Sequence, residues 1–197
     1  MNLALFDFDG TLTTRETFGD FMRFAVTPWR RMLGAPLFVP MLAGYKLGFV
    51  SGTRIRQSVT DFGFRGMPVG HVRAAGERFA AEFLPGVLRP EAMQRMVWHR
   101  NQGDKVVLVS GGLDAYLVPW CRQHGLELIC SILETRGERL TGHYRGAQCV
   151  GEEKARRVRE RHELSAYRTC YAYGDTHEDE AMLALAHKRF YRGVERI

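Results

Sequence analysis

The chain has 197 residues, which is enough for one well-buried domain with an insertion but short for two independent domains. Its 45% hydrophobic and 25% charged residues, without repeats or low-complexity tracts, exclude a largely disordered chain. The net charge of +6 suits an anionic partner such as a phosphorylated metabolite or a membrane surface. The dispersed arginines and the lack of aromatic-interleaved basic motifs argue against nucleic acid.

The cysteines and the first residues favour a cytoplasmic location. Cys121, Cys130, Cys149 and Cys170 contain no CxxC pair, and the chain starts without the cationic region and apolar run of a secretory signal. We therefore expect free thiols in a reducing compartment.

Short apolar runs predict buried strands at residues 3–8, 105–110, 128–133, 169–173 and 188–192, with a hairpin-like excursion at 136–142. Helical patterns lie between them, near 92–97, at 113–121 and at 151–162, the last one polar and expected on the surface. This alternation predicts an α/β fold with a Rossmann-like parallel sheet, helices on both faces and a ligand at the carboxyl ends of the strands.

About 75 residues separate the first strand from the helix before the second, far more than a simple crossover of roughly 10–15 residues needs. We expect an inserted helical cap. Its segment 32–50 is apolar with one charge, and Pro36, Pro40 and Lys46 interrupt it. It is therefore predicted to be an interfacial segment or a buried hairpin rather than a membrane-spanning helix.

Two acids follow the first strand. Asp7 and Asp9 are two residues apart, so strand alternation sends both carboxylates to one side while Phe6 and Phe8 pack on the other. The next residues lack the regularly spaced oxygen ligands of a calcium loop. We therefore expect both carboxylates to point toward the same site.

An anion site is expected after the second strand. The Ser110 hydroxyl and the N–H groups of Gly111 and Gly112 would meet the positive end of a helix, although Ser110 could instead simply cap that helix. Lys154, near the start of a later helix, opposes the helix dipole and invites a compensating anion.

Asp175 and Asp179 stand four residues apart where a loop enters a helix. Together with Asp7 and Asp9 they would place four acids around one pocket. Such a cluster repels itself unless it holds a hard cation, and oxygen ligands without a nearby histidine pair favour magnesium over zinc.

The order strand–DxDGT, strand–Ser-Gly-Gly, helix Lys, strand–GDxxxD resembles the haloacid dehalogenase (HAD) superfamily, in particular its phosphoserine-phosphatase-like subfamily IB. The resemblance runs from Leu3 to about Leu185. It implies a HAD catalytic core of residues 1–13 and 87–197 and a C1-type helical cap of residues 14–86.

The resemblance also implies roles. Asp7 would be the nucleophile that forms an aspartyl-phosphate, and Asp9 the general acid–base. Magnesium would be held by the carboxylates of Asp7 and Asp175 and the backbone carbonyl of Asp9, with Asp179 acting directly or through water. The phosphoryl oxygens would be held by Ser110, Gly111 and Lys154.

Two acids bear on substrate choice. Glu16 lies seven residues beyond Asp9, where similar phosphoserine phosphatases carry an acid that reads the substrate's amino group; its alternative is an ordinary glutamate at a helix start. Glu178 replaces the amide residue usual before Asp179, which bears on metal geometry and on substrate choice.

The expected function is a magnesium-dependent phosphatase acting on a small phosphomonoester, phosphoserine- or histidinol-phosphate-like, or on a lipid phosphate. The alternatives are a phosphotransferase using the same intermediate and a non-catalytic protein that binds anions or a membrane surface. Segment 32–50 resembles phosphatases of the phosphatidylglycerophosphatase C type, which implies peripheral contact with the inner membrane surface. An apolar helix pair packed against the core or a second subunit is the alternative for this segment.

Overall fold

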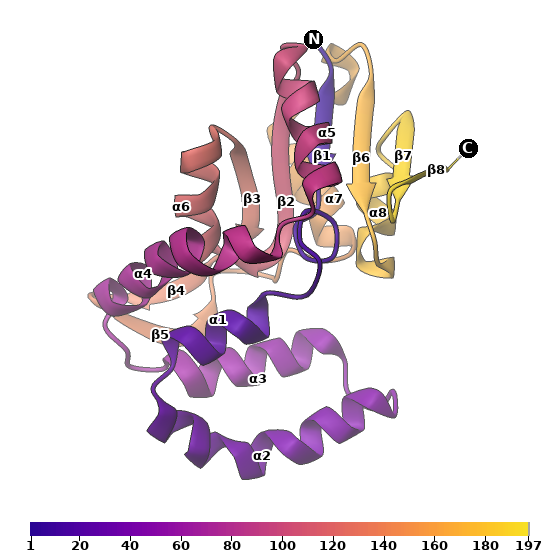
Figure 1. Cartoon of the computed structure of the whole chain (residues 1–197). Coiled ribbons are helices and arrows are strands. Elements are labelled where there is room, and N and C mark those ends of the chain that lie inside the picture. The colour runs from indigo at the N-terminus through magenta and orange to yellow at the C-terminus, as the bar shows by residue number, and fades with distance from the viewer. Residues whose placement is uncertain (197) are drawn as a thin grey trace.

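The computed structural model describes residues 1–196, apart from the side chains at positions 35, 37, 42, 45 and 46. A six-stranded sheet with the order β3-β2-β1-β6-β7-β8 forms its centre (Figure 1). Its strands are β1 (Leu3–Phe6), β2 (Lys105–Leu113), β3 (Glu127–Ser131), β6 (Cys170–Gly174), β7 (Lys188–Tyr191) and β8 (Val194–Arg196). Neighbouring strands are parallel except β7 and β8. The predicted α/β class is confirmed.

Strand β1 shows why helices cover both faces of the sheet. Its side chains alternate, so Ala4 and Phe6 join one buried cluster while Leu3 and Leu5 join another. The first cluster includes residues of α5 (Pro90–Asn101) and α6 (Asp114–His124), and the second includes residues of α7 (Glu152–Arg161) and α8 (Glu180–Leu183). A strand buried on both faces must be apolar throughout, as 3–6 is.

Three short elements refine the sequence prediction. The excursion after β3 is a separate antiparallel hairpin, β4 (Leu133–Arg136) with β5 (Arg139–Tyr144), as expected. Strand β7 matches the predicted fifth strand. The exposed edge strand β8 was not predicted; it follows a two-residue turn in which Arg192 and Gly193 both have positive φ, the backbone that tight hairpins require.

The insertion between β1 and β2 is helical, as predicted. It contains α1 (Phe18–Ala25), α2 (Pro28–Lys46), α3 (Gly52–Phe64), α4 (Val69–Arg78), a π-helical turn at Phe79–Phe83 and a 3₁₀ turn at Leu84–Val87. Its two ends run side by side, since the Thr14 N–H donates to the Val87 carbonyl and the Arg89 N–H to the Leu12 carbonyl, both at 2.8 Å. We propose that residues 14–86 form a cap on a core of 1–13 and 87–197.

Helix α2 departs from the expectation that prolines interrupt segment 32–50. Pro36 and Pro40 both lie inside one helix. They are exposed, so water can satisfy the carbonyls that lose a partner, and the helix bends instead of ending (Figure 1). It packs on α3 through an edge-to-face contact of Phe38 with Phe62. In the part of the chain that the structure describes, no helix is long and apolar enough to cross a membrane.

Candidate active site

Parallel strands bring the predicted site residues to one edge of the sheet. Asp7 directly follows β1, Ser110 lies in β2, and Asp175 directly follows β6. Strand β1 lies between β2 and β6 and is parallel to both. The carboxyl ends of these three strands therefore meet, which is where a parallel sheet places its ligand.

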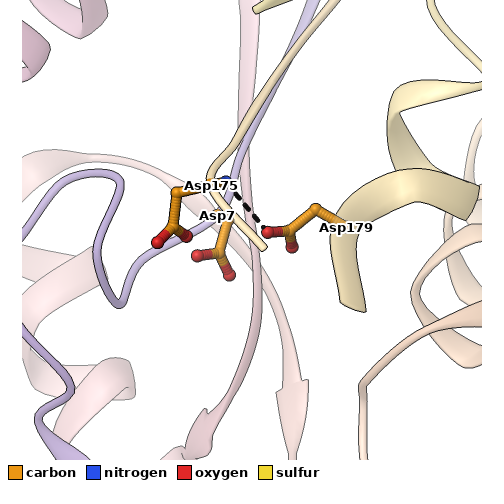
Figure 2. Close-up of side chains that lie close together, drawn as sticks. All are labelled: Asp7, Asp175 and Asp179. Atoms are coloured by element: carbon orange, nitrogen blue, oxygen red, sulfur yellow. Dashed lines mark hydrogen bonds between the residues drawn. The ribbon is translucent and has the colours of Figure 1, made fainter. Parts of the chain in front are cut away.

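Three carboxylates form what we call the acid trio: Asp7, Asp175 and Asp179. One oxygen from each lies within 4.8 Å of the others, and the three side chains converge in Figure 2. Asp179 is the last residue of the short 3₁₀ turn η4 (His177–Asp179), which follows the loop after β6. Its Oδ2 accepts hydrogen bonds from the N–H groups of Asp175 at 3.1 Å and Thr176 at 3.0 Å, which fixes its orientation.

Two glycines let the loops approach the acid trio. A Cβ on Gly10 would lie 2.2 Å from Oδ2 of Asp175, and a Cβ on Gly174 would lie 2.5 Å from Cβ of Asp179. Gly10 also has a φ of 77°, a conformation that side-chain-bearing residues rarely adopt. Only glycine therefore fits at either position without displacing a carboxylate.

Lys154 is a buried partner of the acid trio. Its Nζ lies 2.5 Å from Oδ1 of Asp7 and 2.6 Å from Oδ1 of Asp179. The polar helix α7 was expected on the surface, but its first turn buries this lysine together with Ala155. The compensating anion predicted for Lys154 is thus supplied within the chain, by two of the four predicted acids.

The charges of this group do not balance, because three carboxylates face one ammonium. Burial raises the pKa of Asp7 well above its usual value, and nearby Asp179 adds to this while Lys154 opposes it. Burial, then Asp179, raises the pKa of Asp175. For Lys154 burial alone would lower the pKa, but Asp7 and Asp179 outweigh it and raise it. The excess of oxygen donors fits a hard divalent cation such as Mg²⁺.

Asp9 lines the same cavity as Asp7 but is not one of the acid trio, and it is held by Thr17. Thr17 donates to Oδ1 of Asp9 from its backbone N–H at 2.8 Å and from its hydroxyl at 2.6 Å. Burial, followed by the charge of Glu16, raises the pKa of Asp9 to about 7. At neutral pH this carboxyl is therefore found both protonated and ionised, as a group that gives and takes a proton must be.

Ser110 and Gly111 lie inside the end of β2, and the expectation that this strand stops at Gly111 is wrong. The strand runs to Leu113 and helix α6 begins at Asp114. Ser110 is buried, and its Oγ accepts the N–H of Gly112 at 3.0 Å, so it does not cap the helix. The pairing of β2 with β3 shifts register between Ser110 and Leu113, and the Ser110 hydroxyl takes up the N–H of Gly112 within this irregularity.

The predicted residues line one small cavity of about 30 Å³, room for little more than a water molecule. Its lining includes every predicted catalytic and phosphate-binding residue and Glu16: Asp7, Asp9, Glu16, Ser110, Gly111 and Lys154. Of the predicted metal ligands, Asp175 and Asp179 meet Asp7 in the acid trio beside this cavity.

Further lining residues had no signal in the sequence. They are Phe18, Arg56 and Thr176, whereas Gly112, expected in the anion site, and Glu178 also line the cavity. Arg56 comes from α3 of the insertion, where one arginine among several dispersed ones carries no mark of its role. Glu178 was recognised as unusual, but its contact with Arg56 at 2.7 Å was not foreseen.

Comparisons with known proteins agree with this geometry. Residues 4–184 match the family model of the haloacid dehalogenase-like hydrolases. Protein CicA of Caulobacter vibrioides is 33% identical over 194 residues, which cover 96% of this chain and 85% of that protein.

Solved structures share the fold. A Bordetella pertussis protein described as having unknown function superposes with a TM-score of 0.78 at 20% identity, covering 95% of this chain and 88% of that one. A phosphoserine phosphatase solved as a phospho-aspartyl intermediate analogue superposes with a TM-score of 0.66 at 21% identity, covering 95% and 84%. The HAD resemblance drawn from the motif order is thereby confirmed. Because the family match covers residues 4–184, and with them every motif residue around the cavity, the chain belongs to the haloacid dehalogenase-like hydrolases.

Proposed function

We propose that this protein is a magnesium-dependent phosphomonoester phosphatase that acts through an aspartyl-phosphate on Asp7. One observation carries the proposal: the buried Asp7 carboxylate lies in a cavity that it shares with Asp9, Ser110 and Lys154. A nucleophile, a proton-transferring acid and phosphate-binding donors thus surround one point, as phosphoryl transfer requires. Membership of a hydrolase family supports an enzyme over a non-catalytic anion-binding protein.

The two aspartates divide the chemistry. A carboxylate oxygen of Asp7 attacks phosphorus, the bond from phosphorus to the leaving oxygen breaks, and Asp9 gives that oxygen its proton. Water then attacks the phosphorus of the aspartyl-phosphate, Asp9 takes the proton of that water, and the bond to Asp7 breaks to release inorganic phosphate. Thr17 holds Asp9 in place for both proton transfers.

The remaining residues of the site would bind the phosphoryl group and the magnesium ion. Ser110, the backbone N–H of Gly111 and the Lys154 ammonium would hold the phosphoryl oxygens. Mg²⁺ would be held by the carboxylates of Asp7 and Asp175 and the backbone carbonyl of Asp9, with Asp179 binding directly or through water. When bound, it neutralises charge between these carboxylates and the phosphoryl group.

The test is release of inorganic phosphate from p-nitrophenyl phosphate with Mg²⁺, with chelator, and with Ca²⁺ in its place. We expect full activity with Mg²⁺, none with chelator, and little with Ca²⁺, whose larger and looser coordination misplaces Asp7. Borohydride reduction of the trapped acyl phosphate should convert Asp7 to homoserine, read by peptide mass. Asp7→Asn should abolish turnover, whereas Asp20→Asn, at an acid paired outside the cavity with Arg15, should not. Full activity in metal-free protein would refute the proposal.

A phosphotransferase is the second enzymatic reading, since the same intermediate can react with an alcohol. Adding glycerol or ethanol separates the two. For a phosphatase, inorganic phosphate accounts for all substrate consumed in the absence of an acceptor. A requirement for the alcohol would favour transfer.

The substrate is either a small metabolite or a lipid phosphate, and one surface favours contact with an anionic membrane. Large apolar side chains are exposed along α2 and the turn after it: Trp29, Met32, Leu33, Val39, Leu47 and Phe49, all at least 56% exposed. The exposed Arg31 lies among them. Apolar side chains with a neighbouring cation are typical of peripheral attachment to anionic lipid. We propose a protein of the cytoplasm, its four buried cysteines free, that meets the inner membrane surface through this patch.

Co-sedimentation with vesicles of anionic or of neutral lipid tests the membrane contact. We expect binding to the anionic vesicles that weakens in Trp29→Ser/Phe49→Ser and persists in Val194→Ser, a control at a similarly exposed residue far from the cap. Failure to bind anionic vesicles, together with preferred turnover of a small polar phosphate over a lipid phosphate, would remove the lipid reading and leave the phosphatase proposal standing.

A further inference from the structure

An ion pair between Arg56 and Glu178 lines the cap side of the cavity. Nη2 of Arg56, in α3, lies 2.7 and 3.1 Å from the two carboxylate oxygens of Glu178, in η4, and Nε lies 3.2 Å from the side-chain oxygen of Gln148. Gln148 donates in turn to the Thr53 carbonyl at 2.8 Å. The side chains of Arg56 and Glu178 are only 18% and 28% exposed. Partial burial makes such a pair stronger than one in open water.

The Arg56–Glu178 pair affects the charge that faces the alcohol part of a substrate, beyond its phosphoryl group. Of the two cations lining the cavity, Lys154 is engaged by Asp7 and Asp179, and Arg56 is engaged by Glu178. Glu16 also lines the cavity, and among the side chains that the structure describes no ion pair forms to it. The cap side of the cavity therefore holds one cationic side chain, Arg56, against two acids, Glu178 and Glu16.

We infer that the alcohol part of the substrate carries no second negative charge near the phosphoryl group and is instead neutral or cationic. This inference rests on the proposed phosphatase function and narrows its substrate class. A carboxylate or second phosphate on the substrate would face Glu16, and the charge of Arg56 that could attract it is already offset by Glu178. A hydroxyl group would not be repelled by Glu16, and an ammonium group would be attracted to it.

Competition with Glu178 for Arg56 is costly because the Glu178 carboxylate, which is 28% exposed, would then lie beside another anion without its partner. Removing one partner of a partly buried ion pair leaves an uncompensated charge, and like charges brought together cost further free energy. An ammonium group, by contrast, gains the charge of Glu16. The unusual acid in the fourth motif thus acts on substrate choice by occupying the cap arginine.

The experiment measures matched compounds as competitors of p-nitrophenyl phosphate hydrolysis, so that each yields an inhibition constant whether or not it is turned over. One pair is O-phosphoethanolamine and O-phosphoserine, which differ by a carboxylate. The other is glycerol 3-phosphate and 3-phosphoglycerate, in which a carboxylate replaces a hydroxymethyl group and no amine is present. We expect the carboxylate-free member of each pair to bind at least about tenfold tighter to the wild-type protein.

Glu178→Gln tests the cause. The amide frees Arg56 for an incoming carboxylate, so the preference should shrink by about tenfold or reverse, mainly through tighter binding of the carboxylated compounds. Glu180→Gln, two residues away at an acid that pairs with Arg196 on the surface, should keep the wild-type preference.

The outcomes separate the two proposals. Preferred binding of the carboxylated compounds by the wild type, or an unchanged preference in Glu178→Gln that still hydrolyses p-nitrophenyl phosphate, overturns the inference and leaves the phosphatase standing. Absence of any Mg²⁺-dependent hydrolysis of p-nitrophenyl phosphate by the wild type overturns both.

Discussion

Thr17 donates two hydrogen bonds to one oxygen of Asp9, at 2.8 Å from its backbone N–H and at 2.6 Å from its hydroxyl. The residue that precedes the first cap helix thereby orients the proposed general acid–base. Because Thr17 is fully buried, its hydroxyl has no water to bond instead. Because Thr17 holds Asp9 in this way, the start of the proposed cap forms part of the proposed active site.

Thr17→Val keeps the shape and the backbone bond but removes the hydroxyl. We expect kcat to fall by about tenfold to a hundredfold, a part of the 10²–10⁴ that general acid–base catalysis contributes, with KM little changed. Steady-state kinetics with p-nitrophenyl phosphate measure this. Thr17→Ser should restore kcat. Tyr116→Phe, which removes the other side-chain partner of Thr17 at 3.3 Å, should not reproduce the loss; an equal loss in that variant would argue for a purely structural role.

Lys154→Met should make the stability of the fold depend on magnesium. Without the ammonium, the carboxylates of Asp7 and Asp179 face each other uncompensated, and breaking such a buried pair costs about 3–5 kcal/mol. A divalent cation would restore the balance. We therefore expect a larger rise of Tm on adding Mg²⁺ to Lys154→Met than to the wild type, in thermal unfolding against a chelator-treated sample. Arg159→Met, at an exposed residue of the same helix, should behave like wild type.

Gly10→Ala should disturb the metal site rather than only the backbone. Its Cβ would lie 2.2 Å from Oδ2 of Asp175, so that carboxylate must move. Gly146→Ala is a matched control, because Gly146 has a similar φ of 81° and no atom within 4 Å of the added Cβ. Both variants should lose about 1–2 kcal/mol of stability from the left-handed backbone. Only Gly10→Ala should need more Mg²⁺ for half-maximal activity, and an equal requirement in both would contradict the placement of Asp175.

Because His99 is buried, we expect the free energy of unfolding to fall in mild acid. Its imidazole is buried with Nδ1 2.8 Å from Oδ2 of Asp104 and Nε2 2.8 Å from the Tyr173 hydroxyl. Burial lowers its pKa from the ordinary 6.5, although Asp104 opposes this. The unfolded chain therefore takes up the proton first as pH falls. The stability from neutral His99 is full above pH 6.5 and is lost below it by about 1.4 kcal/mol per pH unit, until the folded histidine also titrates.

Urea unfolding at about pH 7.5 and about pH 5.5 tests this, since the two values bracket the ordinary histidine pKa. The free energy of unfolding should fall more between these values in the wild type than in His99→Gln. His71→Gln, at an exposed histidine, should keep the wild-type dependence. Equal losses in the wild type and His99→Gln would show that other groups cause the acid sensitivity.

Local sequence pattern was sufficient for the five parallel strands, though not for the edge strand β8, and for most of the site. The apolar runs ending at Asp7 and Asp175 are typical of buried strands in a parallel sheet, and parallel strands bring their carboxyl ends together. The position of Ser110 follows from the same geometry, whereas the burial of Lys154 does not, because α7 was expected on the surface. The exceptions are local too: β2 runs on to Leu113, and α2 continues through Pro36 and Pro40, because neighbouring backbone or water takes the hydrogen bonds that the pattern alone seemed to forbid.

The cap side of the cavity depended on the tertiary structure. Arg56 and Glu178 are 122 residues apart, and which face of α3 turns toward the core depends on how its apolar residues pack against the β4-β5 hairpin and α2. Periodicity identifies a helix but not the partner of each face. The sequence therefore determined where phosphoryl chemistry can occur, because Asp7, Ser110 and Asp175 lie at the ends of strands of one sheet. Only long-range packing decided which charge meets the rest of the substrate, because that charge comes from two elements with no local relation.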